Sequence, residues 1–288
     1  MGEALAAPLA DLSENAVRLS RDREKRYGYL SEAATALVMH LASLGEGESP
    51  AALYAAAAAD LPALPPGDAV DFSALFLRAV EGQVGRPLTL LDLPDGARVP
   101  PGRHRIVYVE SPISADACAR FAALFTDAVC HTRMTLRELC DDVENGYAEY
   151  AILPLFADGA AIPSVTALLE ERGLAIAATV RCPVREGEIV YGLLSASPVL
   201  LFPPTHFFLR YRAEGETGAS PVLAALAEFP LAVEYLDTLP SSYDGAVFRI
   251  LVRGEEGTFL QLLSYLLLYV PTFMGYGFYT ELTGKELL

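Results

Sequence analysis

Histidine and cysteine are the residue types that most readily bind metal ions, and their spacing in this chain is not that of a metal site. The four histidines form neither an HxH nor an HExxH pair, and the four cysteines form no CxxC pair. These residues are His40, His104, His131, His206, Cys118, Cys130, Cys140 and Cys182. The cysteines fall within expected helices and strands, which is typical of ordinary core thiols in a reducing compartment. We therefore expect no metal centre and no cofactor.

Three hydroxyl side chains are weak candidates for catalysis. Ser111 and Ser114 follow an expected strand, where they could bind a carboxylate at the N-terminus of the next helix. The alternative is that Ser114 only caps that helix. Thr205 opens the string Thr-His-Phe, whose meaning depends on the strand to which it belongs. No GxGxxG or Walker spacing follows any expected strand, so a nucleotide site is not indicated.

The charge balance argues against a surface for nucleic acid. The net charge is −16, from 37 acidic and 21 basic residues among 288, whereas duplex binding needs a concentrated face of Lys and Arg. The basic cluster at residues 18–26 is interleaved with Asp22 and Glu24, which favours a solvated helix face. No apolar stretch reaches the roughly 20 residues of a bilayer span, and the N-terminus lacks a secretory pattern. We expect a cytoplasmic protein without nucleic-acid or membrane partners.

Composition predicts three regions. Residues 1–100 are rich in Ala and Leu and indicate helices over 13–43, 49–61 and 72–81, with a break near Gly28 and a linker at 91–103. Residues 103–200 alternate strands and helices, which predicts one α/β lobe with a largely parallel sheet. Residues 203–288 predict a ferredoxin-like βαββαβ unit on an antiparallel sheet. The fold class is therefore α/β and α+β, with a helical N-terminal region.

The expected elements after the linker can be given by residue number. Strands are expected over 105–110, 128–132, 150–155, 174–183, 188–195, 206–213, 231–236, 246–253 and 273–282. Helices are expected over 115–125, 135–145, 165–172, 221–228 and 258–269.

The middle region resembles prephenate dehydratase. The stretch from Thr135 to Pro154, TLRELCDDVENGYAEYAILP, is similar to that family's helix and the run xVExGxADYxVLPIENS. Residues 106–109 resemble the family's opening strand, and residues 113–119 resemble its TFSExAA helix start. The resemblance implies a catalytic unit of two lobes of the periplasmic-binding-protein type, followed by a regulatory ACT domain.

The last region resembles that ACT domain. Residues 205–211 with Gly218-Ala219 look like its first strand and PGAL turn, and residues 231–240 resemble the strand that carries the ligand motif ESRP. The resemblance implies a homodimer that binds an amino acid through Gly218, Ala219, Asp237, Thr238 and Leu239. Because Leu239 replaces the family's arginine, phenylalanine is not implied as the ligand. A module that only dimerises remains the alternative.

Three departures from the family weaken the catalytic interpretation. Thr205 belongs to the first strand of the last region, so the strand equivalent to the family's Thr-Arg-Phe is 189–191, which has neither threonine nor cation. The ENS that follows Leu-Pro in the family is replaced by residues 156–158. Only a few residues lie between Val180 and Glu188, where the family inserts its second lobe. Without that lobe there is no cleft to orient a substrate.

Three functions follow as hypotheses. The first is a non-catalytic relative of prephenate dehydratase that senses an amino-acid-like small molecule or acts as a dimeric regulatory or assembly subunit. The second is an active prephenate dehydratase-like enzyme of aromatic amino acid biosynthesis with a rebuilt site. The third is a protein–protein adaptor that acts through the N-terminal helices.

Overall fold

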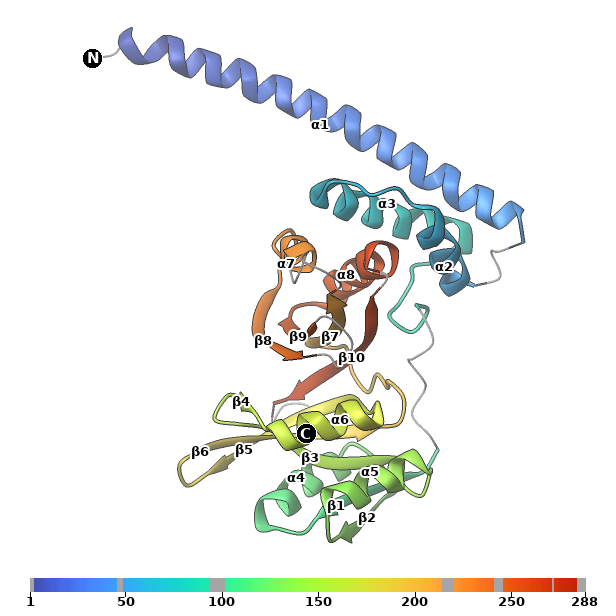
Figure 1. Cartoon of the computed structure of the whole chain (residues 1–288), viewed down its shortest axis with the longest axis vertical. Coiled ribbons are helices and arrows are strands. Elements are labelled where there is room, and N and C mark those ends of the chain that lie inside the picture. The colour runs from blue at the N-terminus through green and yellow to red at the C-terminus, as the bar shows by residue number, and fades with distance from the viewer. Residues whose placement is uncertain are drawn as a thin grey trace. The chain divides into compact units, whose positions relative to one another are not determined.

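A computed structural model describes residues 3–45, 49–93, 102–213, 220–240, 246–270 and 272–283 (Figure 1). The chain divides into two compact units. The first unit contains Met1–Leu88, Pro221–Glu228 and Gln261–Pro271. The second contains Thr89–Ser220, Phe229–Leu260 and Thr272–Leu288. The expected linker lies largely outside the described residues.

Three helices open the first unit: α1 (Glu3–Ser43), α2 (Pro50–Asp60) and α3 (Pro66–Val84). The expected break of α1 at Gly28 is wrong, because a single glycine costs a helix only about 1 kcal/mol relative to alanine. Ser49 caps α2 as expected, and its Oγ accepts from the Ala52 N–H at 3.2 Å. Helix α1 packs along α3 through a buried stripe that includes Ala34, Val38 and Leu41.

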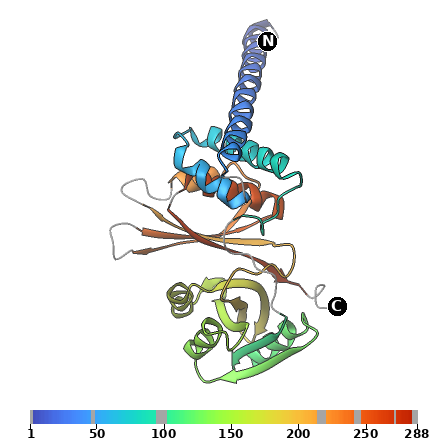
Figure 2. The same cartoon turned by 90° about the vertical axis from the view of Figure 1, so that its right-hand side faces the viewer.

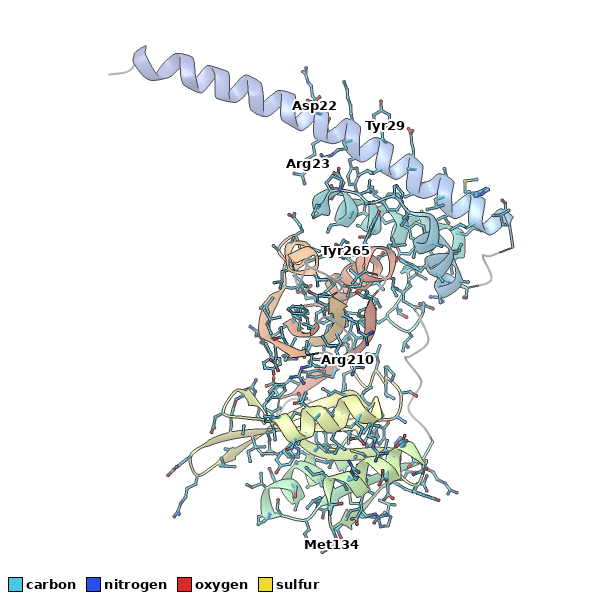
Figure 3. All side chains as sticks on the ribbon, viewed as in Figure 1. Asp22, Arg23, Tyr29, Met134, Arg210 and Tyr265 are labelled. Carbon is cyan, nitrogen blue, oxygen red and sulfur yellow. The ribbon has the colours of Figure 1, made fainter. Side chains whose placement is uncertain are left out.

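The opposite face of α1 is exposed. Tyr29 and Met39 retain 72% and 64% of their accessible surface, and Asp22 is also exposed (Figure 3). The charged side chains at residues 21–26 are all exposed, as the alternating charges predicted, and Arg26 pairs with Asp68 of α3 at 3.0 Å.

A buried hydrogen-bond chain links α2 and α3 to the part of helix α8 (Glu256–Tyr269) that belongs to the first unit. Tyr54 Oη lies 2.7 Å from Ser264 Oγ, which donates to the main-chain oxygen of Ser73 at 2.9 Å. Since the Ser264 proton goes to Ser73, the Tyr54 hydroxyl is the donor to Ser264. Phe72 packs edge-to-face on Tyr269 beside this chain. Through these contacts the N-terminal helices and the last part of α8 form one core.

The ten strands all belong to the second unit. They are β1 (His104–Val109), β2 (Ala128–Arg133), β3 (Tyr150–Ala157), β4 (Ala160–Ala161), β5 (Ala175–Val184), β6 (Gly187–Ser195), β7 (His206–Ala213), β8 (Ala232–Pro240), β9 (Ala246–Arg253) and β10 (Phe273–Leu282). The strand order is β2-β1-β3-β6-β5-β10-β7-β9-β8, and the short β4 pairs with β3. The protein is therefore a mixed α/β structure, as expected.

The sheet of the middle region is mixed rather than largely parallel. Strands β1, β2 and β3 are parallel, but β6 is antiparallel to both β3 and β5. The reason is the two-residue turn Arg185–Glu186 between β5 and β6, since only antiparallel strands can be joined so tightly. The chain between Leu174 and Ser195 is one hairpin, and no second lobe is inserted there.

Helices cover both faces of this part of the sheet. Helix α4 (Pro112–Ala122) packs on one face with Ile106, Tyr150 and Ile152. Helices α5 (Leu136–Glu144) and α6 (Pro163–Arg172) pack on the other face with Ala151 and Leu153. Adjacent residues of β3 therefore belong to different hydrophobic cores, because successive side chains of a strand point to opposite faces of the sheet.

The last four strands form an antiparallel set in the order β10-β7-β9-β8, with helix α7 (Ser220–Leu226) after β7 and α8 after β9. This is the ferredoxin-like arrangement of a βαββαβ unit. Phe207 and Phe278 face the start of α8, where Phe259 packs on both. His206, Phe208 and Arg210 of β7 lie on the other face.

Strand β10 belongs to two ladders. Phe273–Tyr279 pairs antiparallel with β7, whereas Thr280–Leu282 pairs parallel with Ala178–Val180 of β5 (Figures 1 and 2). Arg181 of β5 forms an ion pair with Glu281 at this junction. The α/β region and the ferredoxin-like unit therefore share one continuous sheet, which the sequence did not predict.

The described residues contain neither a membrane-spanning helix nor a metal-binding cluster. No described helix is both long and apolar enough to span a bilayer. No three His, Cys, Asp or Glu side chains in the described ranges gather closely enough to hold a metal ion.

Cys118, Cys140 and Cys182 are buried, but Cys130 is exposed, so the expectation of a core thiol is wrong there. Its Sγ lies 3.0 Å from that of Cys118.

The Tyr54–Ser264–Ser73 chain predicts unequal costs for removing its two hydroxyls. Tyr54→Phe removes one buried hydrogen bond and should lower the free energy of unfolding by about 1 kcal/mol. Ser264→Ala leaves the Tyr54 hydroxyl and the Ser73 carbonyl buried without this partner, and should cost about 2–3 kcal/mol. Urea denaturation of both variants and of the double variant tests this. The double variant should be more stable than the sum of the two single costs predicts, and strict additivity would contradict the chain.

Candidate functional site

The predicted ligand residues lie on and before β8. Gly218 and Ala219 lie outside the described residues. Asp237, Thr238 and Leu239 lie on β8, at the edge of the sheet, and pair with Arg249, Phe248 and Val247 of β9. The Leu239 side chain is also outside the described part of the structure.

The carboxylate of Asp237 is held within its own sheet. It accepts the Tyr235 hydroxyl at 2.9 Å and the Thr238 N–H at 2.6 Å, and it forms an ion pair with the buried Arg249. Burial alone would raise the pKa of Asp237, but the hydrogen bonds from Tyr235 and Arg249 outweigh burial and lower it. The charge of Asp237 is thus neutralised from within the protein.

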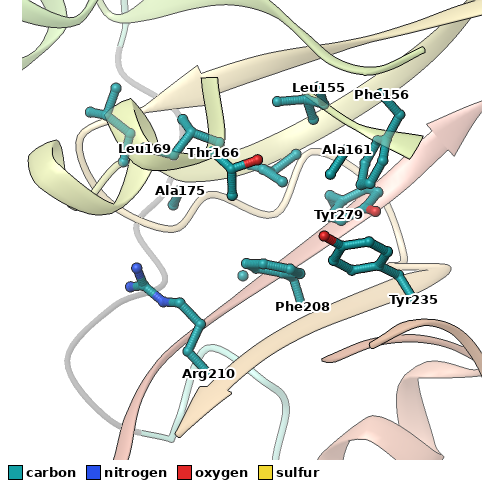
Figure 4. A pocket seen from close by; sticks show the side chains of 13 residues that line it. Leu155, Phe156, Ala161, Thr166, Leu169, Ala175, Phe208, Arg210, Tyr235 and Tyr279 are labelled. Carbon is teal, nitrogen blue, oxygen red and sulfur yellow. The ribbon is translucent and has the colours of Figure 1, made fainter. Parts of the chain in front are cut away.

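A groove lies between one face of the ferredoxin-like sheet and the helix-covered part of the middle region; we call it the sheet-face groove (Figure 4). Its volume is about 690 Å³ when the space open to solvent is included. The floor comes from strands β7, β8 and β10, and the wall from β3, β4, α6 and β5. The lining residues are Leu155, Phe156, Ala161, Thr166, Leu169, Leu174, Ala175, Ile176, Phe208, Arg210, Tyr235, Gly277 and Tyr279.

The lining combines aromatic rings with one cation. Phe156 meets Tyr235 edge-to-face, with ring centroids 5.9 Å apart. Arg210 extends from β7 toward the wall that carries Leu169 and Ala175 (Figure 4). Such a combination of apolar surface with a charged group is the usual make-up of a small-molecule site. The sequence patterns indicated none of these lining residues as ligand-binding.

A polar cluster adjoins the groove at its Tyr279 side. His206 is buried and stacks on Tyr279 at 5.1 Å, with its Nε2 3.2 Å from Glu234 Oε2. Glu234 also pairs with Arg253 at 2.8 Å, and Glu281 pairs with Arg181. Burial lowers the pKa of His206 more than the two glutamates raise it, so the imidazole is held neutral.

Thr205 is part of this cluster but does not resemble an activated nucleophile. Its hydroxyl lies 2.9 Å from His206 Nδ1 and accepts the Glu281 N–H at 3.1 Å. The chain Thr205–His206–Glu234 has the residue types of a nucleophile, a base and an orienting acid. However, Thr205 lines neither the groove nor the adjoining hollow that His206 and Glu234 line. The Thr205 hydroxyl therefore opens onto neither of these two hollows.

Ser111 and Ser114 form a capping box at the start of α4. Ser111 is the N-cap and accepts the Ser114 N–H at 3.1 Å, while Ser114 Oγ accepts the Ser111 N–H at 3.0 Å and donates to the Val109 oxygen at 2.6 Å. Ser114 is 5% exposed. Both serines act in the cap, and Ser111 rather than Ser114 occupies the N-cap position.

The carboxyl ends of β1 and β2, where an α/β sheet usually binds its ligand, carry only an open hollow. Arg133 at its edge is paired with Asp142 at 2.6 Å, and Glu138 accepts the Met134 and Thr135 N–H groups. Met134 is 86% exposed (Figure 3). No element covers this edge within the described residues, so water is not excluded from it.

Comparison with known proteins gives similarity in structure only. No protein-family model matches the chain, and no curated protein matches its sequence. One similar structure is a prephenate dehydratase from Streptococcus mutans, with 13% identity, 62% of this chain and 100% of that chain covered, and a TM-score of 0.48. A second structure, described as GqqA, a novel type of quorum quenching acylase, is 22% identical in sequence. The match covers 62% of this chain and 95% of that chain, and its TM-score is 0.47. A third structure, a prephenate dehydratase from Staphylococcus aureus subsp. aureus Mu50, is 10% identical in sequence. The match covers 61% of this chain and 99% of that chain, and its TM-score is 0.48.

Removing the carboxylate of Asp237 should destabilise the fold. In Asp237→Ala the buried Arg249 loses its ion-pair partner, which costs about 3–5 kcal/mol for a fully buried pair and less here because the Asp237 side chain is 36% exposed. We expect a loss of about 2 kcal/mol in the free energy of unfolding. Glu171→Ala removes the exposed partner of Arg137 and a 3.8 Å contact of Arg172, which keeps Asp141 and Glu144, and it should cost under about 1 kcal/mol. Equal costs for the two variants would show that Asp237 is not structural.

His206 should make stability depend on pH. Because its pKa in the folded protein lies below the ordinary 6.5, the unfolded chain takes up a proton first as pH falls. The free energy of unfolding should therefore decrease between about pH 7 and pH 5.5. In His206→Gln this decrease should be smaller. Denaturation at both pH values would measure it, and identical pH dependences would contradict a neutral His206.

Proposed function

We propose that this protein is a non-catalytic relative of prephenate dehydratase that senses a small, amino-acid-like molecule and acts as a dimeric regulatory subunit. The observation that carries the proposal is the β5–β6 hairpin, whose two-residue turn stands where the family resembled in sequence has its second lobe. A dehydration needs a closed site that orients the substrate and excludes water. The open hollow at the ends of β1 and β2 does not supply one.

The sensing part of the proposal is supported by the sheet-face groove. The groove is formed where the ferredoxin-like unit meets the middle region, so a ligand there would contact both. Binding would stabilise the contacts between the two regions, and a ligand that favours one state of a protein in this way can regulate it without chemistry.

The dimeric part is supported by the edge strand β8. It ends the sheet, and Val233 and Leu236 keep 49% and 46% of their surface exposed. An exposed edge with apolar side chains is a template for pairing with a second copy of the chain. We place the dimer interface at this edge.

Binding and activity measurements on the full chain separate the proposal from the enzyme alternative. Isothermal titration with the standard amino acids and with prephenate should detect at least one ligand at micromolar to millimolar concentration. Incubation with prephenate should yield no phenylpyruvate. Formation of phenylpyruvate by the pure protein would establish the enzyme. Failure of every compound to bind would leave the dimeric role, which sedimentation equilibrium tests: a monomer at all concentrations would exclude that role too.

A further inference from the structure

We propose that Cys118 of α4 and Cys130 of β2 form a reversible modification site for thiol–disulfide exchange. Cys130 is the thiol that first reacts with a low-molecular-weight disulfide, and Cys118 then completes a bond within the chain. Neither residue lines the sheet-face groove, so the site is independent of the proposed sensing role.

The first observation is that the two sulfur atoms face each other. Both cysteines are free thiols, and Cys118 Sγ donates a hydrogen bond to Cys130 Sγ at 3.0 Å. Cys130 lies directly beside Ile106 in the parallel ladder of β1 and β2, and Ile106 packs in the same core as Cys118. The Cys130 side chain therefore points to the face of the sheet that α4 covers. A disulfide bond is about 2 Å long, so the sulfurs need to approach by only about 1 Å.

The second observation is that the two thiols differ in exposure. Cys130 is exposed, whereas Cys118 is only 4% exposed. Burial raises the pKa of Cys118, and its proton is held in the hydrogen bond to Cys130. A small oxidant can reach Cys130 but not Cys118, so the order of reaction is set by the fold.

The third observation is that the remaining cysteines are closed to a small molecule. Cys140 is 0% exposed in the core beneath α5, and Cys182 is 1% exposed in the core beneath α4. Cys182 Sγ also lies 3.7 Å from the Asp116 carboxylate, which disfavours a thiolate there. Oxidation of the native protein should thus be confined to the pair, and Cys140 provides a matched buried control.

The fourth observation is the position of Cys130 on an edge strand. Strand β2 ends the sheet and is paired only with β1 among the described strands, and its residues 129–132 are all exposed. A strand held on one side can shift by about 1 Å at little cost, as bond formation requires. Thr132, two residues beyond Cys130, lines the open hollow at the ends of β1 and β2. The bond would therefore restrain the strand that forms one side of that hollow.

The chemistry balances with a small disulfide as the oxidant. The Cys130 thiolate attacks one sulfur of that disulfide, which forms a mixed disulfide and releases one small thiolate. Cys118 Sγ then attacks Cys130 Sγ, its proton passes to solvent, and the second small thiolate leaves. The two cysteines are oxidised and the small disulfide is reduced to two thiols. The second step is intramolecular between adjacent sulfurs, which offsets the low thiolate fraction of Cys118. An excess of small thiol reverses both steps.

Oxidation of the full chain with glutathione disulfide tests the pairing. The remaining thiols are alkylated after unfolding, and the products are identified by intact mass and peptide mapping. The native protein should lose two hydrogens and carry one bond between Cys118 and Cys130. In urea the same treatment should give a mixture of pairs, since Cys130 and Cys140 are about as close in sequence as the proposed pair. A mixture from the native protein, or dimers joined through Cys130, would overturn the proposal.

Single variants test the order of the two steps. In Cys118→Ala the reaction should stop at the mixed disulfide, with one glutathione on Cys130. Cys130→Ala should react at least about tenfold more slowly than the unmodified sequence, because Cys118 is buried. Cys140→Ala should form the bond as the unmodified sequence does. Should Cys118→Ala fail to fold, Cys130→Ala still decides: a reaction as fast as that of the unmodified sequence would overturn the assignment.

Thermal unfolding tests the restraint on β2. Because the bond closes the loop of residues 118–130, the oxidised protein should melt about 5 °C above the reduced protein. Excess reduced glutathione should restore the original melting temperature. Cys140→Ala should show the same rise, and Cys130→Ala should show none. A melting temperature that is unchanged or lower after complete formation of the bond would contradict a restraint on this edge.

Discussion

Strand β10 is hydrogen-bonded on both sides to strands of different regions, and the geometry of the second unit depends on this. Phe273–Tyr279 completes the ferredoxin-like set beside β7, and the next three residues pair with β5 of the middle region. A continuous ladder allows little rotation between the two regions. The face of β7, β8 and β10 is therefore held opposite β3, β4 and α6, and the sheet-face groove exists because of that constraint.

The charged residues of this face lie in two places, the sheet-face groove and the polar cluster beside it. The acids Asp237, Glu234 and Glu281 are each matched by a cation of the protein, and burial keeps His206 neutral. Arg210 lies in a part of the face where hydrophobic side chains surround it. The charges of the cluster are thus matched within the protein, as is typical of a structural element.

The sequence predicted much of the local structure because its patterns are strong. Strands β7, β9 and β10 have the predicted bounds, since alternating aromatic and β-branched residues are bounded there by glycine and proline. The direction of β5 and β6 was missed because the regular alternation of strands and helices outweighed the short turn at Arg185–Glu186. Gly28 was overestimated as a helix breaker, because the packing of α1 on α3 offsets its weak propensity.

The candidate site was not predictable in the same way. Its walls come together through the pairing of β5 with β10, whose partners Arg181 and Glu281 are 100 residues apart in the chain. No pattern of neighbouring residues in the sequence predicts such a pairing. On strand β7, Arg210 alternates with buried residues, a pattern typical of a sheet with one face in water, so the sequence did not indicate that a second element lies over this face.

The hydrogen bond between Tyr54 and Ser264 joins residues 210 positions apart and has a consequence for the order of folding. Contacts between α1 and α3 are local and can form early, whereas the loop that Tyr54 and Ser264 close is among the longest the chain contains. Until α8 arrives, the ring of Phe72 has no Tyr269 to pack against. The N-terminal helices therefore pass through a stage in which they are helical but incompletely buried. During synthesis this stage lasts until most of the chain has been made. A chaperone that recognises apolar helices would bind them in this period.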